Sequence, residues 1–307
     1  MSVLCVPEHT EIPVGDRFST DAVAPSISAR HVVSLDRFNR AMQSRKAPVP
    51  FELGYRSVRS RQHCGVIALG REAIEILPKI EVPGTSESDV TARIRLFSML
   101  IFARRLPIHQ AEATRLATQR HGLLEVFVRL YCTQALALVR AGMVHRYERH
   151  DDNLRVLRGK LVLPVHVSLN AARQDRVYCA FDEFTPDNAV NQIIKAAARR
   201  AASVVTSAST QGMLRELIYS LDEVTDRKFT ADAYWAIPRD RIAHLYRNVL
   251  ELGAMILFGP LPDVVSGDVS QVALLFVMNK LFEEFVGRHM VRLASTLNAE
   301  VALQGPP

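Results

Sequence analysis

Two acidic segments stand in the order that metal-dependent nucleases use. Residues 186–187 are Pro-Asp and residues 226–228 are Asp-Arg-Lys, which spells PD…(D/E)xK. That chemistry needs both carboxylates and the lysine on neighbouring strands, where they converge on Mg²⁺ and an attacking water. Here Thr185 is instead placed to cap a helix, with the proline at the first helical position and Asp187 in the first turn. We therefore predict no catalytic residue at these positions or elsewhere in the chain.

Other kinds of catalytic or cofactor site are not indicated. The sequence has no GxxxxGK[ST] or GxGxxG motif to cradle phosphates and no GxSxG elbow to hold a nucleophilic serine. The 10 histidines are dispersed, without a Cys or His at zinc spacing. The four cysteines form no CxxC pair and are typical of reduced thiols in a cytoplasm. We expect no metal and no cofactor in this chain, so any nucleotide dependence would come from a partner.

The stretch FDEFTPDNAVNQIIKAAARR, residues 181–200, places acids before a helix and basic residues near its end. The helical spacing leaves Lys195 and Arg199 one turn apart on the exposed side. Because like charges at that spacing repel, a nearby anion would explain them, either Asp182 and Glu183 or an external partner. A solvated face is the alternative. The buried face of this helix is predicted to hold Val190, Ile194, Ala197, Ala201 and Val204.

The N-terminal part of the chain has the pattern of strands and loops. Prolines recurring from residue 7 to residue 50 argue against long helices, and we extend this interpretation to about residue 81. CGVIALGREAIEIL places two apolar runs around Gly70, which predicts a hairpin. The EAIEIL run alternates in part, so we expect one face of it to be half-buried. After a turn-rich linker, Ser86 or Ser88 is placed to cap a helix that ends near Phe102.

The rest of the chain is predicted to be mainly helical. Apolar residues at spacings of three and four predict a helix over residues 122–147, which ends at the polar break RHDDN. Strand patterns follow over residues 154–184, with Gly159 where two strands turn. Helical patterns then continue almost to the end of the chain. The last helix, over residues 268–296, is predicted to have an apolar stripe of Leu274, Met278, Leu281 and Phe285.

Length and composition set the broad class. A chain of 307 residues with 48% apolar residues is long enough for about two domains. We place the boundary so that residues 1–83 form a β-rich N-terminal domain and residues 84–307 a mainly helical one with inserted strands, an α+β fold. The formal charge of +6 favours weak attraction to polyanions. The absence of a secretory leader and of a long apolar run favours a cytoplasmic protein without a membrane partner.

Four segments, read in order, resemble one known family. They are CGVIALGREAIEILPKIE, GLLEVFVRLYCTQALALVRAGMVHRYERHDDNLRVLRGKL, VYCAFDEFTPDNAVNQIIKAAARR and ALLFVMNKLFEEFV. Their order and content are similar to those of the McrC family, the partner subunits of the 5-methylcytosine-specific McrBC restriction system. The resemblance covers roughly residues 60–295.

The resemblance implies a subunit whose β-rich N-terminal region contacts a hexameric AAA+ GTPase, McrB. The subunit stimulates GTP hydrolysis by that partner, which binds the GTP and translocates DNA. In this family a C-terminal PD-(D/E)xK domain cuts the DNA with Mg²⁺, and its acidic motif follows soon after the segment resembling ALLFVMNKLFEEFV. The sequence reaches Pro307 without that motif, so we expect the nuclease fold to be absent or truncated. A fragment, a natural truncation or split gene, and a nuclease in another chain are all open explanations.

Two sets of contact residues follow from these interpretations. Exposed charges on rigid turns can enter the pore of a ring or the clefts between its subunits. The partner-binding candidates are Arg158, Lys160, Asp182, Glu183 and Asp187. The alternative function is a basic nucleic-acid-binding or structural scaffold protein without catalytic activity. In that case the residues expected to contact phosphates are Lys195, Arg199 and Arg200.

Overall fold

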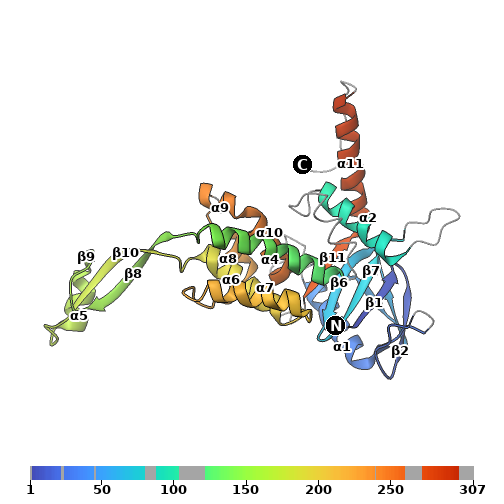
Figure 1. Ribbon diagram of the computed structural model, residues 1–307. Coiled ribbons are helices and arrows are strands. Elements are labelled where there is room, and N and C mark those ends of the chain that lie inside the picture. The colour runs from blue at the N-terminus through green and yellow to red at the C-terminus, as the bar shows by residue number, and fades with distance from the viewer. Residues whose placement is uncertain are drawn as a thin grey trace.

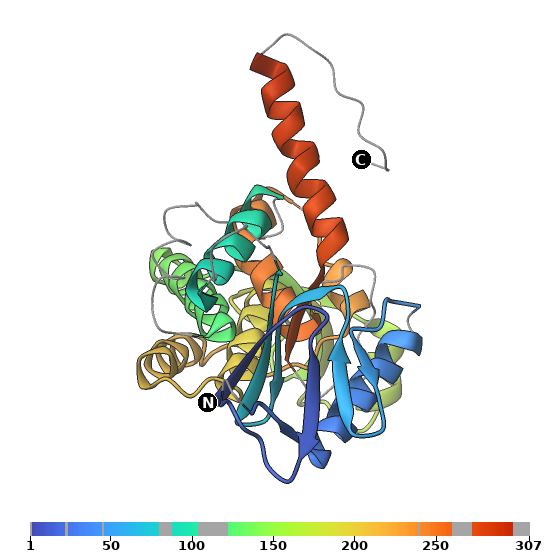
Figure 2. The same ribbon diagram turned by 90° about the vertical axis from the view of Figure 1, so that its right-hand side faces the viewer.

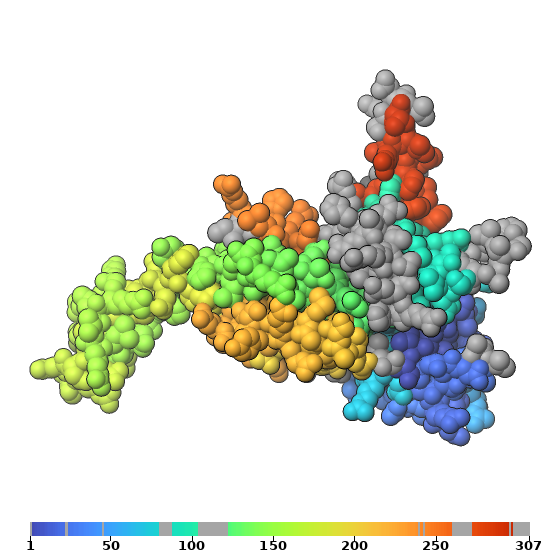
Figure 3. Space-filling view, in the orientation of Figure 1, coloured from blue at the N-terminus to red at the C-terminus, as the bar shows by residue number. Residues whose placement is uncertain are grey.

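The computed structural model describes residues 2–21, 24–44, 46–79, 88–103, 122–238, 240–259 and 272–296. Two N-terminal sheets lie at one side of the molecule, helices form its middle, and a narrow β-arm extends from the other side (Figure 1). The space-filling view shows the arm as a thin projection from a broader body (Figure 3). The α+β expectation is confirmed.

The first sheet has the strand order β1-β7-β6-β11. β1 runs parallel to β7, whereas β6 is antiparallel to both β7 and β11. The bounds of these strands are β1 Ser2–Pro7, β6 His63–Leu69, β7 Glu72–Leu77 and β11 Ala273–Val277. The second sheet has the order β3-β2-β5-β4, with β2 Glu11–Gly15, β3 Ile27–Ser28, β4 Phe51–Leu53 and β5 Ser57–Ser60.

The hairpin predicted around Gly70 is confirmed, since β6 and β7 pair on either side of it. Gly70 has a φ of 76°, a left-handed conformation that glycine adopts without steric cost. The expectation of a half-buried EAIEIL strand is wrong. Residues 73–77 are all buried, because helices cover one face of the first sheet and the second sheet packs on the other.

A long N-terminal helix contradicts the expectation of strands and loops alone. Helix α1, Ala29–Ser44, lies between Pro25 and Pro48, in a stretch without proline. Its buried residues recur at helical spacing and pack with the second sheet: Leu35, Phe38 and Met42. The prolines therefore delimit this helix and do not exclude it.

Strand β11 contradicts the long terminal helix predicted over residues 268–296. Residues 273–277 form the strand that pairs with β6, and helix α11, Met278–Thr296, begins only after it. Figure 2 shows α11 rising from the end of this sheet and projecting beyond it. Residues 268–271 lie outside the described part of the chain, as do residues 297–307. A short apolar run such as ALLFV fits a helical stripe and a buried strand equally well, and pairing with a distant strand decides between them.

The helical body packs on the face of the first sheet. Its elements in chain order are α2 Asp89–Phe102, α4 Leu123–Ala141, α6 Ala189–Ala202, α7 Ala208–Ser220, α8 Ala231–Trp235, α9 Arg241–Leu245 and α10 Arg247–Phe258. Ser88 caps α2 by accepting a hydrogen bond from the backbone N–H of Thr91, as one of the two predicted alternatives. Ser86, the other, lies outside the described residues. The burial predicted for this face is confirmed at all five positions, although Val204 lies just beyond the end of α6.

A buried carboxylate joins the sheet to the helices. Glu75 on β7 accepts hydrogen bonds from the backbone N–H of Leu123, at 2.6 Å, and from Nε of Arg93, at 2.8 Å. The first of these satisfies a donor at the start of α4, where the helix dipole favours a negative charge. Because the side chain of Glu75 is fully buried, both bonds are needed to offset its desolvation.

Candidate partner-binding site

The candidate site is the arm, residues 146–185. Its long strands are β8, Arg146–Leu154, and β10, Val177–Thr185, which pair antiparallel over all nine residues of each. The short strand β9, Lys160–Leu161, adds to the other edge of β10. The helix expected to end at residue 147 therefore ends earlier, at residue 141, and the RHDDN segment belongs to β8 and not to a break. Gly142, with a φ of 129°, terminates α4.

One predicted strand of this region is a helix. Helix α5, Leu163–Asn170, packs on β10 near the tip of the arm. Asn170 is buried and exchanges two amide hydrogen bonds with Asn153 of β8, at 2.8 and 2.9 Å. It also lies 3.1 Å from Nδ1 of His166. Pro164 suits the first turn of a helix, which explains why this apolar stretch does not continue as a strand.

Gly159 lies in a bend directly before β9, but the predicted turn between two paired strands is wrong, because β10 lies between β8 and β9 in the sheet. The φ of Gly159 is 67°, and a Cβ atom there would lie only 2.4 Å from the carbonyl oxygen of Ala180. Glycine is therefore required both by the conformation and by the close approach of β10. The bend at Gly159 sets the positions of Arg158 and Lys160, the residues on either side of it.

Four of the five partner-binding candidates come together on the arm. The guanidinium of Arg158 donates to Glu183 at 3.3 Å, and its Cζ lies 4.3 Å from the centre of the Phe181 ring. Asp182 is opposite Arg149 in the β10–β8 register, and Lys160 is exposed on β9. The arm thus carries charges of both signs on paired strands, with Arg158 held in one orientation by a carboxylate and an aromatic face.

The fifth candidate, Asp187, lies at the base of the arm, and its expected role in a helix is wrong. The first helical residue is Ala189, and the cap is Asn188, whose Oδ1 accepts from the backbone N–H groups of Val190 and Asn191. Thr185 instead accepts from the N–H of Asp187 in a short turn that precedes the helix. Asn188 is the better cap because its Nδ2 also donates to the carbonyl oxygens of Val144 and Pro186.

The carboxylate of Asp187 connects two segments that are distant in sequence. It accepts from the backbone N–H of Thr225 at 2.8 Å, from the Thr225 hydroxyl at 2.5 Å and from Gln192 at 2.8 Å. Burial opposes ionisation of this group, but the hydrogen bonds from Thr225 and Gln192 lower its pKa below the usual value. Asp187 is therefore a structural acceptor as the structure describes it.

The base of the arm is clamped by buried amides. Asn188 and Asn191 are both buried, and the Nδ2 atom of each donates to the carbonyl oxygen of Val144 at 2.8 Å. The guanidinium of Arg146 pairs with Asp240 at 2.9 Å. These contacts join the start of β8 to α6 and to the cap of α9, so the arm is fixed to the body and not merely tethered to it.

The arm has almost no core. Within residues 146–185 only Asn170 and Cys179 are buried. Large apolar side chains stand exposed along it instead, from 37% to 75% exposed: Tyr147, Val156, Leu157, Leu161, Leu163, Val167, Leu169 and Phe184. Exposed apolar surface of this density, mixed with charges, is typical of a surface that another protein covers.

Of the two residues predicted to be exposed on α6, Arg199 is exposed but Lys195 is not. That side chain is buried, and its Nζ donates to the carbonyl oxygen of Val224 at 2.5 Å. Arg199 is exposed but donates to Asp226 at 2.5 Å. Burial lowers the pKa of Arg200. The anion that explains these charges is thus Asp226, and neither Asp182 nor Glu183.

Asp187 and Asp226 both contact helix α6, through Gln192 and Arg199. In the described part of the chain, no group of three or more His, Cys, Asp or Glu side chains lies close enough to hold a metal ion. The described helices include none that is long and apolar enough to cross a membrane.

Comparison with known proteins decides the family. The model described as McrBC 5-methylcytosine restriction system component matches residues 58–305. The chain belongs to that family. The predicted resemblance to McrC is thereby confirmed.

Two solved structures share the fold of this McrBC family member. A chain from the cryo-EM structure of the Thermococcus gammatolerans McrBC complex matches with a TM-score of 0.71 and 21% identity, covering 98% of this chain and 89% of that one. A chain from the half-complex of T. gammatolerans McrB AAA+ hexamers with bound McrC matches with a TM-score of 0.71 and 20% identity, covering 95% and 70%. No curated protein matches the sequence.

Two features of the arm of this McrBC component escape sequence reasoning. Tyr147 and Phe184 are opposite each other in the β8–β10 register, with ring centres 5.0 Å apart. No motif or spacing in the sequence marks this pair. The Val144 clamp was also missed. Its only signal was the pair of asparagines in DNAVN, at positions that a buried helix would ordinarily fill with apolar residues.

Proposed function

We propose that this chain binds a McrB-type hexameric AAA+ GTPase and stimulates its GTP hydrolysis, as the McrC-type subunit of a modification-dependent restriction system. Membership of the McrBC family supports the system, and the shared fold supports the type of subunit. The observation that carries the partner contact is the arm, which projects from the body (Figure 3). Charged and apolar side chains are exposed along it.

The dimensions of the arm suit a ring. Nine residues of paired strand extend about 30 Å, and two to three strands are only about 10–15 Å wide. An element of that shape reaches the pore of a hexameric ring or the clefts between its subunits. The clamp at Val144 and the ion pair of Arg146 with Asp240 keep it from bending when load is applied.

Its chemistry suits a protein partner better than a nucleic acid. Arg158, Lys160, Asp182 and Glu183 bring two positive and two negative charges, which fits a mixed protein surface and not a row of phosphates. The apolar side chains would supply the buried part of the interface. We propose that Arg158 and Lys160 contact the GTPase directly, and that Asp187 supports the base of the arm.

The proposal extends to the reaction of the whole system. The GTP is bound by the partner, the partner moves the DNA, and the complete subunit delivers a Mg²⁺-dependent endonuclease. None of the residues described in this structure is proposed to cut DNA. The complex is proposed to act in the cytoplasm.

GTP turnover by the cognate motor tests the proposal. Wild-type chain should co-elute with the motor and raise its turnover. Arg158→Ala combined with Lys160→Ala should reduce the stimulation by about 10-fold or more, since interfacial charged anchors contribute about 1.5 kcal/mol or more. The control is Arg215→Ala, because Arg215 is an exposed arginine on α7, away from the arm.

Three results would count against the proposal. The first is a failure of the wild-type chain to co-elute or to stimulate turnover. The second is equal stimulation by the arm variant and the Arg215 control. The third is tight, salt-sensitive DNA binding by the isolated chain, which would favour the nucleic-acid alternative. The burial of Lys195 and the pairing of Arg199 with Asp226 give that alternative no support.

A further inference from the structure

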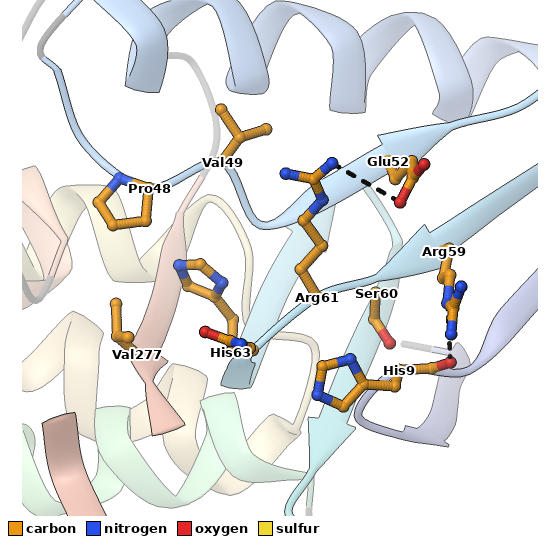
Figure 4. Close-up of a pocket in the computed structure, with 10 residues that line it drawn as sticks. His9, Pro48, Val49, Glu52, Arg59, Ser60, Arg61, His63 and Val277 are labelled. Carbon is orange, nitrogen blue, oxygen red and sulfur yellow. Dashed lines mark hydrogen bonds and ion pairs between the residues drawn. The ribbon is translucent and has the colours of Figure 1, made fainter. Parts of the chain in front are cut away.

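A cavity far from the arm is lined by polar groups without an assigned role. It has a volume of about 560 Å³, in the range of small-molecule sites. It lies where the start of β6 meets the end of β11 and the loop before β4 (Figure 4). The polar and charged side chains around it are His9, Glu52, Arg59, Ser60, Arg61, Gln62 and His63.

His63 is the unexplained group in this cavity. His63 is only 3% exposed, yet neither Nδ1 nor Nε2 has a hydrogen-bond partner in the described part of the chain. Burial, followed by the positive charge of Arg61, lowers the pKa of His63 to about 4. The ring is therefore neutral at pH 7 and presents one N–H donor and one acceptor. A buried polar ring without a hydrogen-bond partner is destabilising, and a ligand in the cavity would supply that partner.

The charges beside His63 favour an anion. Arg61 is paired only loosely with Glu52, at 3.6 Å, and both side chains are more than half exposed. Its guanidinium can therefore turn to a ligand at little cost. Arg59 also lines the cavity, and its Nε donates to the carbonyl oxygen of His9 at 3.3 Å. A cation would be repelled by the two arginines, and a purely apolar ligand would leave His63 unsatisfied.

We infer that this cavity binds a phosphate group. Phosphate oxygens accept several hydrogen bonds at once, so one group can engage the planar fork of Arg61 and the N–H of His63 together. The basic run RSVRSR thereby acquires a role at its last arginine. The phosphate comes either from a free phosphate compound or from a nucleic-acid backbone. The inference does not depend on the GTPase partner.

The site is connected to helix α11. His63 is opposite Val277 in the β6–β11 register, and the backbone N–H of Met278 donates to the carbonyl oxygen of Gln62 at 2.9 Å. Val277 lines the cavity as well (Figure 4). A bound phosphate therefore contacts the segment at which the strand passes into α11, and we expect it to stabilise that junction.

Binding is tested on the full chain with three probes: inorganic phosphate, pyrophosphate and a short DNA duplex. Calorimetry with the first two and fluorescence anisotropy with the duplex give the dissociation constants. Arg61→Gln should weaken binding by about 10-fold or more, because hydrogen bonds to a charged group typically contribute that much. Arg56→Gln is the matched control, since Arg56 is an exposed arginine of the same segment that does not line the cavity.

His63→Leu gives a second, independent measurement. The variant should lose binding while its melting temperature stays the same or rises, because an unsatisfied polar group is replaced by an apolar one of similar volume. If this variant fails to fold, Arg61→Gln still decides the question.

The outcomes separate the sources and the alternatives. Arg61-dependent binding of phosphate or pyrophosphate supports the site with a small compound as its ligand, and Arg61-dependent binding of the duplex alone supports it with nucleic acid. Equal effects of Arg61→Gln and Arg56→Gln would indicate unspecific attraction and overturn the inference. Absence of binding by all three probes would leave a water-filled cavity and overturn it too. Stimulation of the GTPase is measured separately and can fail or succeed independently.

Discussion

The clamp at the base of the arm gives a prediction whose size follows from individual hydrogen bonds. Asn188 does two things: its Oδ1 caps α6, and its Nδ2 donates to the carbonyl oxygen of Val144 at 2.8 Å. Loss of an asparagine cap costs about 1 kcal/mol, and loss of a buried hydrogen bond costs about 1 kcal/mol more. Asn188→Ala should therefore lower the free energy of unfolding by about 2 kcal/mol.

Two companion variants separate these contributions. Asn188→Ser keeps an oxygen that can cap the helix but cannot reach Val144. This variant should therefore lower the free energy of unfolding by about 1 kcal/mol. Ser207→Ala is the matched control, because Ser207 is the N-cap of α7 but makes no capping hydrogen bond with its side chain. Its effect should stay within about 0.5 kcal/mol.

Urea unfolding measures all three variants. Trp235, the single tryptophan, lies on α8 and reports on the helical body. The urea concentration at the midpoint of unfolding should be highest for Ser207→Ala, lower for Asn188→Ser and lowest for Asn188→Ala. The dependence of the free energy of unfolding on urea concentration should be the same for all three. Stimulation of the motor should also fall for the Asn188 variants, because the arm is then less firmly held. An Asn188→Ala midpoint equal to that of Ser207→Ala would refute the assignment of the amide as a clamp.

Three further predictions rest on single contacts. Arg93→Ala should cost about 3–5 kcal/mol in thermal or urea unfolding, because it leaves the buried Glu75 carboxylate without its ion-pair partner. Gly159→Ala should reduce stimulation of the motor while the helical body stays folded by circular dichroism, because the added Cβ meets the backbone of β10. The pKa of Asp187 is lower in the folded protein than its unfolded value near 3.8, so its ionised carboxylate stabilises the fold at pH values above 3.8. This stabilisation is lost as the pH falls through the folded pKa. Because Thr225→Val removes one hydrogen bond to the carboxylate, the variant should show a smaller difference in melting temperature between pH 6 and pH 3 than the wild type.

Sequence reasoning succeeded where one local signal was sufficient. Gly70 predicted its hairpin because a left-handed residue between two apolar runs has few other uses. The buried face of α6 followed from spacing alone. The ordered motifs identified the family. The domain boundary at residue 83 stays a prediction, as does the location of the nuclease.

The failures share a physical cause, which is dependence on contacts far away in sequence. β11 is a strand because β6 offers an unpaired edge, and nothing within ALLFV records that edge. Lys195 has the spacing of an exposed residue, but the carbonyl oxygen of Val224 receives its amine inside the protein. Asn188 was overlooked as a cap because Thr185 and the following proline form an equally good local signal.

The return of the chain to its first sheet has a mechanical consequence. In the sequence, the helices of the body and the strands of the arm come after β7 and before β11. In the sheet, β7 and β11 are the two neighbours of β6. The core of the body is continuous with that sheet, since Val66 of β6 and Leu274 of β11 belong to the same cluster as Tyr131 of α4. Both ends of the body are thus anchored on one rigid surface, and the arm is clamped to the body at Val144. If the arm binds the motor as proposed, load on it would pass into the sheet, whose last strand leads directly into α11.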